Sequence, residues 1–135
     1  MDLKPVILQG QSVRLEPLEL TRHWPGLLAI GLDPDLWRWT SSKIGSEADL
    51  RRYLERAVAE QVGGVSLPFV TVLAESGEVV GCTRFGNIVR EHKRAEIGWT
   101  WVARTHQRTI VNTEAKYLML RHAFEVWGLM RVELK

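Results

Sequence analysis

The residues best placed to bind a charged ligand lie where a strand-like segment passes through a short loop into a helix. The segment AEIGWTWVA leads into the loop RTHQRTIV, and a helix is predicted to begin near Asn112. The first backbone N–H groups of a helix lack intrahelical partners, and the helix dipole adds partial positive charge there. Together with Arg104 and Arg108 in the loop, this pattern predicts a phosphate site. The alternative interpretation is an ordinary helix capped by Asn112 or Thr113, with solvated arginines.

Gly98 interrupts a run of residues that favour strands. Glycine weakens a strand and often marks a bulge or the close approach of another backbone. A bulge would separate this strand from its neighbour, so that backbone groups of Trp99 to Val102 could pair with an amide-containing ligand. The alternative is a glycine packed under one of the tryptophans Trp37, Trp39 or Trp127.

Glu96, just before this glycine, is the candidate general base. A carboxylate close to an amine can take its proton directly or through a water molecule. The alternative is a strand carboxylate paired with Arg84 or Arg94. Two histidines are weaker candidates for the base: His106 fits a loop position near phosphate, and His122 fits a packed helix position.

Composition limits the classes of partner. Eighteen Lys and Arg residues against sixteen Asp and Glu residues give a net charge of +2, so no strong field favours nucleic acid or an anionic membrane. The four histidines and one cysteine lack metal-ligand spacing, so no metal is expected, and Cys82 is interpreted as a small core residue. With no secretory signal pattern and no long apolar run, a cytoplasmic location is expected.

The elements that must position these residues form one predicted α+β domain spanning residues 1–135. A strand pair is expected within Val6 to Leu18, then a short helix capped by Thr21 with Pro25 in its first turn. Ser46 is expected to cap an amphipathic helix that ends before Gly63. The expected later elements are strands at Leu67 to Ala74, Val79 to Val89 and Arg94 to Ala103, a helix at Thr113 to Trp127 ending at Gly128, and a strand at Met130 to Leu134.

Several segments together resemble the GNAT acetyltransferase superfamily. They are GCTRFGNI from Gly81, EIGWTWV, QRTIVNTEAKYLMLRHAFE, MRVELK, VRLEPLEL and DLWRWT. The branch that they resemble most is that of ribosomal-protein and peptide N-acetyltransferases. The resemblance implies a GNAT-like, mostly antiparallel mixed sheet flanked by helices.

The resemblance also implies acetyl-CoA as co-substrate and transfer of its acetyl group directly to a primary amine. The backbone of Trp99, Thr100, Trp101 and Val102 would then pair with the pantetheine arm, in a gap between two splayed strands. The positions matching the pyrophosphate loop are Gln107, Arg108, Thr109, Ile110, Val111 and Asn112. Trp37 and Trp39 are the candidate walls of the acceptor pocket, which would take a small molecule or a protein N-terminus.

Two features depart from the family pattern. Ile110 stands where the family has glycine, and it would be strained if its φ were positive. The family also continues beyond the strand matching Met130 to Lys135 with a helix and a strand pair, so the fold is expected to be C-terminally truncated. The exposed apolar area would then favour a homodimer that completes the core. These departures leave a second function open, that of a catalytically impaired binding or oligomerisation module.

Overall fold

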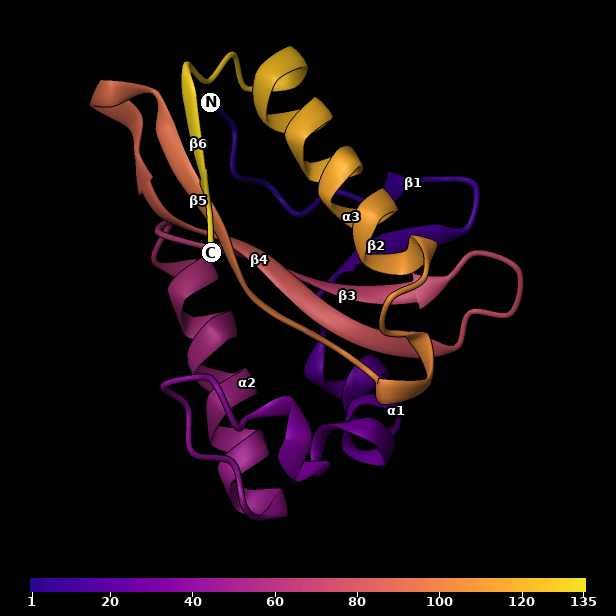
Figure 1. The fold of residues 1–135 in the computed structure, drawn as a ribbon. Coiled ribbons are helices and arrows are strands. Elements are labelled where there is room, and N and C mark those ends of the chain that lie inside the picture. Colours follow the sequence, from indigo (N-terminus) through magenta and orange to yellow (C-terminus); the bar gives the residue numbers. More distant parts are fainter.

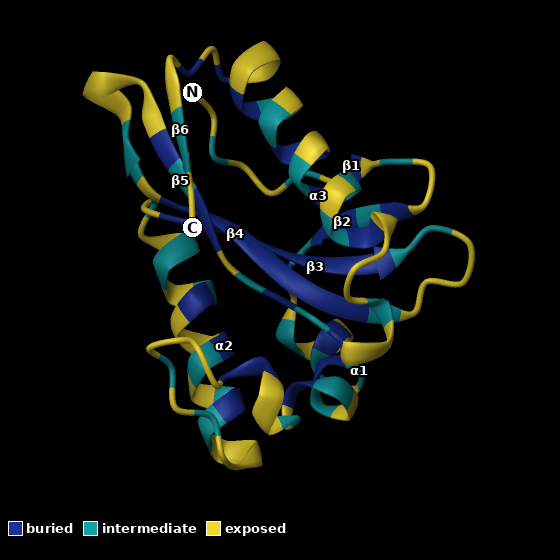
Figure 2. Ribbon diagram, in the orientation of Figure 1, coloured by how far each residue is buried: buried dark blue, intermediate teal, exposed yellow.

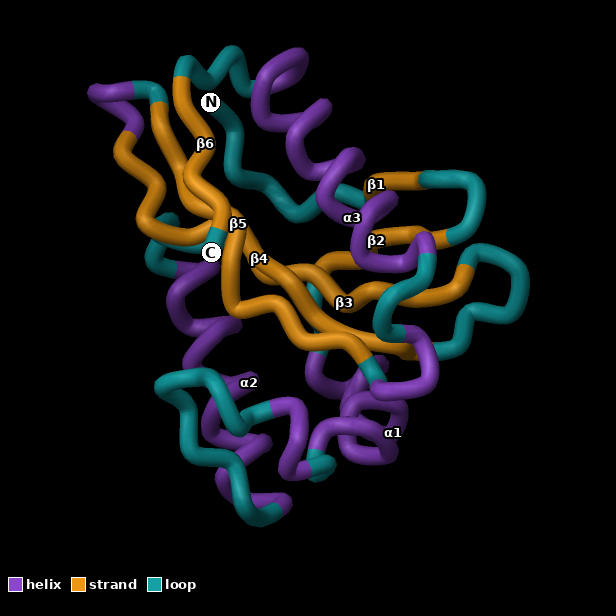
Figure 3. Tube along the Cα trace, in the orientation of Figure 1, coloured by secondary structure: helices purple, strands orange, loops and turns teal.

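A single six-stranded sheet organises the chain, and the computed structural model describes all residues 1–135. The strands lie in chain order: β1 (Leu8–Gln9), β2 (Val13–Pro17), β3 (Leu67–Leu73), β4 (Val79–Val89), β5 (Arg94–Val102) and β6 (Arg131–Leu134). Each neighbouring pair is antiparallel except β5 and β6, which are parallel because α3 crosses over between them. The α+β class and the mostly antiparallel mixed sheet are confirmed (Figures 1 and 3).

Helices cover both faces of the sheet. One face packs against α3 (Ile110–Arg121), and the other packs against α1 (Leu20–Gly31) and α2 (Glu47–Val62). Figure 2 shows β3 and β4 as the most continuously buried ribbons, between these layers. Two apolar clusters result, and side chains alternate between them along the central strands because successive strand residues point to opposite faces.

The predicted cap of α2 is confirmed, and that of α1 is wrong. The Ser46 hydroxyl accepts the N–H of Asp49 at 3.1 Å, as the sequence pattern predicts. Helix α1, however, begins at Leu20, so Thr21 lies inside it and Pro25 lies beyond its first turn. The reason is His23, whose Nδ1 accepts the backbone N–H of Glu19 at 3.0 Å and so fixes an earlier start.

Helix α3 also begins before its predicted position. Thr109 is the N-cap, and its hydroxyl accepts the N–H of Val111 at 3.3 Å, so Asn112 and Thr113 are not caps. The helix continues as a π-helical turn at His122–Val126. The predicted terminating glycine is confirmed, because Gly128 has a φ of 67° and lies in the left-handed region.

Candidate active site

The predicted bulge lies in the middle of β5. In the ladder with β4, Cys82 lies opposite Trp101 and Arg84 lies opposite Gly98, so β5 has one more residue than β4 over this stretch. The extra residue is accommodated at Trp99, whose φ of 53° is left-handed. This conformation costs a tryptophan roughly 1–2 kcal/mol, so the surrounding contacts must hold it.

Gly98 does not lie beneath a tryptophan. A Cβ placed on Gly98 would lie 3.4 Å from Glu96 Oε2 and 3.4 Å from the Cβ of Lys135. The alternative of a glycine packed under Trp37, Trp39 or Trp127 is therefore wrong. Gly98 lies between the candidate base and the residue that follows β6.

The edge of β5 that faces β6 becomes open beyond the bulge. The parallel ladder pairs β5 with β6 only from Arg94 to Ile97, and one further hydrogen bond joins the Lys135 N–H to the Ile97 carbonyl at 3.1 Å. From Trp99 to Val102, β5 has a strand neighbour on the β4 side only. One of its carbonyls is already occupied, because Gln107 Nε2 donates to the Val102 oxygen at 2.9 Å.

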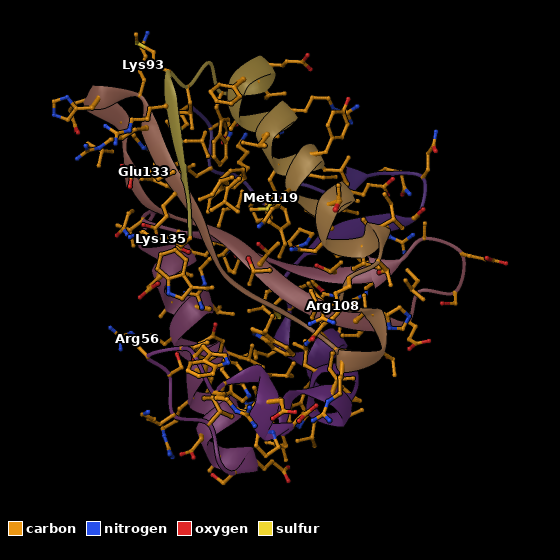
Figure 4. All side chains as sticks on the ribbon, in the orientation of Figure 1. Arg56, Lys93, Arg108, Met119, Glu133 and Lys135 are labelled. Atoms are coloured by element: carbon orange, nitrogen blue, oxygen red, sulfur yellow. The ribbon has the colours of Figure 1, made fainter.

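In the loop before α3, the left-handed backbone conformation considered for Ile110 is found at Arg108 instead. Arg108 is the left-handed residue of the loop, with a φ of 60°. Ile110 is the first residue of α3, has no positive φ, and leaves 56% of its surface exposed. The strain considered for Ile110 is therefore absent. Figure 4 shows Arg108 in this loop and Lys135 at the end of β6.

Two other residues of the predicted phosphate loop have competing contacts. The side chain of Val111 is buried in the core under α3, and its N–H is bonded to the Thr109 hydroxyl. Arg104 turns away to the segment after α1, where its guanidinium contacts Asp33 at 2.6 Å and 3.0 Å and Asp35 at 2.7 Å. The hydrogen bond from Arg104 lowers the pKa of Asp33, which keeps this pair charged. Arg108 therefore remains as the cation of the loop that is free of an ion pair.

Two adjoining pockets bring most of the predicted residues together. The loop-side pocket, about 390 Å³, contains predicted residues from both β5 and the loop. The tryptophan pocket, about 560 Å³, contains the predicted base and the predicted acceptor walls. They share Trp39, Thr100, Trp101 and Lys135, so they meet at the bulge. The loop-side pocket is lined by Asp35, Leu36, Trp39, Thr100, Trp101, Val102, Gln107, Asn112, Lys116 and Lys135. The tryptophan pocket is lined by Trp37, Trp39, Thr40, Ser41, Ser42, Tyr53, Asn87, Glu96, Trp99, Thr100, Trp101 and Lys135.

Among the lining residues that were not predicted, Lys116, Asn87 and Lys135 bear most directly on ligand binding. Lys116 follows Asn112 by four positions and so lies on the same side of α3, a spacing visible in the sequence. Asn87 and Lys135 come from the end of β4 and from the residue after β6, and no local pattern connects them. All three add polar or cationic groups to the two pockets.

Glu96 lines the tryptophan pocket and has weak polar partners. Asn87 Nδ2 donates to Glu96 Oε1 at 3.3 Å, and Lys135 Nζ lies 4.0 Å from the same oxygen. The alternative pairing with Arg84 is wrong, because Arg84 pairs with Glu60 at 3.2 Å. No ion pair with Arg94 forms either. The carboxylate is therefore available to a group in the pocket.

Trp37 and Trp39 both line the tryptophan pocket but differ in burial. Trp37 is buried, donates from Nε1 to the Gly31 carbonyl at 2.8 Å, and packs against Trp101 with ring centroids 5.3 Å apart. Trp39 is 89% exposed. Trp37 is thus a fixed wall, and Trp39 lies at the pocket's surface.

The remaining reactive side chains lie outside these two pockets. Cys82 is buried in the cluster under α1 and α2, and burial raises the pKa of its thiol to about 12, as suits a core residue. Burial lowers the pKa of His122, which packs edge-on against Trp127 at the far end of α3. His106 lies in the loop and contacts the Thr105 hydroxyl. None of the three lines either pocket.

The comparison of sequences defines the family. Residues 12–135 match the family described as acetyltransferase (GNAT) domain, and the chain belongs to that family. No curated protein sequence gives a significant match. No helix in the structure is both long enough and apolar enough to cross a bilayer.

Solved structures with the same fold cover nearly all of this chain. A T. thermophilus protein assigned as an acetyltransferase is 34% identical, with a TM-score of 0.85, and the match covers 100% of this chain and 69% of that one. A GCN5-related N-acetyltransferase from Brucella melitensis is 27% identical, with a TM-score of 0.84, and the match covers 96% and 59%. An acetyl transferase from Salmonella typhimurium that modifies the N-terminal serine of 50S ribosomal subunit protein L7/L12 shares the fold at 17% identity, with a TM-score of 0.80 and coverage of 96% and 74%. This chain therefore spans between 59% and 74% of the length of these three proteins.

Proposed function

We propose that the protein is an N-acetyltransferase that uses acetyl-CoA to acetylate a primary amine. The observation that carries the proposal is the bulge of β5, whose open edge lies where the loop-side pocket meets the tryptophan pocket. An extended donor with amide groups can pair with such an edge, and an amine can approach from the other pocket. Family membership supports this division between a donor side and an acceptor side.

The donor side fits a nucleotide diphosphate with an extended amide-containing arm. Lys116 lines the loop-side pocket together with Asn112, and Arg108 adds positive charge in the loop just before α3. The N–H groups of Ile110 and Asn112, in the first turn of α3, have no hydrogen-bond partner within the protein. Thr100 lies on the open edge of β5, whereas the Trp101 carbonyl faces Gly81 of β4. The side chain of Ile110 projects largely into solvent, so it does not fill the space beside these backbone N–H groups.

The acceptor side supplies a base and a shaped wall. Acetyl-CoA, when bound, provides an activated acyl carbon, and the overall reaction forms an amide and releases a thiol. Glu96 takes the proton that the amine nitrogen loses as the new C–N bond forms. Backbone N–H groups at the bulge stabilise the negative charge that develops on the acyl oxygen. Trp37 and Trp39 orient the amine, which belongs to a small molecule or a protein N-terminus.

Two measurements test the function separately. Isothermal titration calorimetry with acetyl-CoA is expected to show one site per chain, and an Arg108→Ala variant is expected to bind more weakly. Arg51→Ala is the matched control, since Arg51 pairs with Glu55 on α2 and neither residue lines the two pockets. Thiol release from acetyl-CoA with a panel of primary amines then measures turnover. If acetyl-CoA does not bind to the wild-type protein, the proposed function is wrong.

A binding module without turnover is the competing function. Ile110 in place of the family's glycine is the feature that favours it. Such a module would give a calorimetric signal with acetyl-CoA but no thiol release with any amine in the panel. Turnover with a single amine would exclude it.

We also propose that two copies associate. Strand β6 pairs on one side only, and the neighbouring apolar side chains of Met130 and Leu134 are exposed. Light scattering at micromolar concentration is expected to give the mass of a dimer, and Met130→Asp is expected to shift the mass toward that of the monomer. A stable wild-type monomer would exclude the association.

A further inference from the structure

A buried arginine lies beside the bulge on the face of the sheet that packs against α2. Arg84 of β4 is only 6% exposed, and its guanidinium donates to Glu60 of α2 at 3.2 Å. The same guanidinium lies 5.4 Å from the ring centroid of Tyr53 and 5.0 Å from that of Trp99. One buried cation therefore contacts a carboxylate and two aromatic rings, an arrangement that compensates its loss of hydration.

On a second side, the ring of Trp99 packs against β4 at Gly86, a residue without a side chain. A Cβ on Gly86 would overlap the six-membered ring of Trp99, so the indole lies directly against the β4 backbone at this glycine. Gly86 has ordinary strand geometry, without a positive φ. A glycine is therefore needed here to leave room for the indole, and not to permit an unusual backbone conformation.

Thr100, which follows Trp99 in the bulge, is held by contacts on the opposite face of the sheet. Thr100 Oγ1 lies 2.9 Å from Thr83 Oγ1, and the Thr83 hydroxyl also contacts the sulfur of Met119 on α3. Trp99 and Thr100 are thus directed to opposite faces, and each has a partner on β4. The left-handed φ of Trp99 persists because contacts on both faces determine it.

We propose that Arg84 is a positioning residue that acts through Trp99. By holding the indole over Gly86, Arg84 keeps the β5 bulge in the conformation that leaves the edge of β5 at Thr100 open to a donor. Trp99 lines both the tryptophan pocket and a further pocket of about 620 Å³, which Glu60, Gly86, Glu96 and Glu133 help to line. The catalytic consequence rests on the proposed acetyltransferase function, whereas the conformational consequence does not.

The test replaces Arg84 with residues that keep one of its properties at a time. Arg84→Met keeps a side chain of similar length with an apolar stem but removes the charge. Replacement of a buried ion by an apolar residue is often tolerated. Arg84→Lys keeps the charge but not the planar group that stacks on the rings. Arg56→Met is the matched control, because Arg56 also pairs with Glu60, at 3.5 Å, but contacts neither ring.

The first readout does not need acetyl-CoA. The difference in tryptophan emission between each protein and its Trp99→Phe counterpart isolates the signal of Trp99. We expect this signal to shift to longer wavelength in Arg84→Met, partly in Arg84→Lys, and not in Arg56→Met, while circular dichroism confirms folding. Gly86→Ala is expected to give the same shift by displacing the ring. An unchanged Trp99 signal in folded Arg84→Met and Gly86→Ala would overturn the proposal.

The second readout is the affinity for acetyl-CoA by calorimetry, with KM and kcat where turnover is measurable. Arg84→Met is expected to raise the Kd and the donor KM about tenfold, with little change in the acceptor KM. A shifted Trp99 signal with unchanged donor affinity would overturn the catalytic role of Arg84. If wild type itself does not bind acetyl-CoA, the proposed function fails, and the emission measurement still decides whether Arg84 holds Trp99.

Discussion

Glu114 of α3 caps the turn that precedes β2, and its Oε1 accepts the backbone N–H of Val13 at 2.7 Å. The same oxygen accepts the N–H of Ser12 at 2.8 Å. The two segments are about a hundred positions apart in sequence, so this carboxylate fixes α3 to the edge of the sheet. The acidic residue of the NTEAK segment is therefore structural, while Asn112 at the start of that segment lines the loop-side pocket.

This contact predicts a stability effect without a direct effect on the site. Glu114→Ala is expected to lower the free energy of unfolding by about 2–3 kcal/mol, since it leaves two backbone donors without their charged acceptor. Glu114→Gln keeps one acceptor oxygen and is expected to lose less. Urea denaturation measures both, with the exposed neighbour Thr113→Ala as control. A Glu114→Ala protein as stable as Thr113→Ala would contradict the assignment.

The base role of Glu96 predicts a loss in kcat. Glu96→Gln is expected to lower kcat about 10²-fold while the Kd for acetyl-CoA stays within about twofold, because an amide cannot accept the proton of the amine. The matched control is Glu133→Gln, since Glu133 lies opposite Glu96 in β6 but does not line the tryptophan pocket. Thiol-release kinetics measure the effect. Equal losses in both variants would remove Glu96 from the chemistry.

The exposed position of Ile110 predicts that its side chain does not block the donor. Ile110→Gly is expected to bind acetyl-CoA with an equal or lower Kd, at a cost of about 0.5–1 kcal/mol in stability from the weaker helix former. Ile110→Val keeps the branched side chain and serves as the control. Calorimetry decides the matter: a Kd that rises more than about tenfold only in the glycine variant would show that the isoleucine supports binding.

The buried carboxylate of Glu16 predicts a loss of stability in acid. Burial alone would raise its pKa, but hydrogen bonds from His23 at 2.9 Å and Arg14 at 2.8 Å, with the charge of Arg22, outweigh burial and lower the pKa. Because the folded-state pKa lies below the unfolded value, the stabilisation is complete above the ordinary glutamate pKa. It is lost as the pH falls through the folded-state value.

Denaturation at several pH values checks this direction. The wild-type free energy of unfolding is expected to fall as the pH is lowered from about 5 to about 3. Glu16→Gln is expected to be less stable at neutral pH, with a shallower decline. Glu75→Gln, at an exposed position, is the control and is expected to follow the wild type. A Glu16→Gln curve parallel to that of the wild type would contradict the role of this carboxylate.

Local sequence patterns predicted which helices and strands form more accurately than the residues at which they begin. The spacing of Ser46 and Asp49 placed the start of α2 correctly, because an N-cap depends on neighbours within one turn. The starts of α1 and α3 were misplaced, because His23 supplies a partner for Glu19 and the Thr109 hydroxyl caps α3. Each of these segments offers several capping residues of similar strength, and a local hydrogen bond within four residues selects one of them.

The sequence by itself determined the alternation of strands and helices, the glycine that marks the bulge, and the resemblance of the β5, loop and α3 segments to one family. These features are local, and the intrinsic preferences of neighbouring residues set them. Only the tertiary structure decided that Arg104 would pair with Asp33, that Trp37 would be buried while Trp39 stayed exposed, and that Arg84 would lie against Trp99. Such pairings depend on which distant segments the sheet register brings together, and burial then selects among side chains whose local preferences are the same.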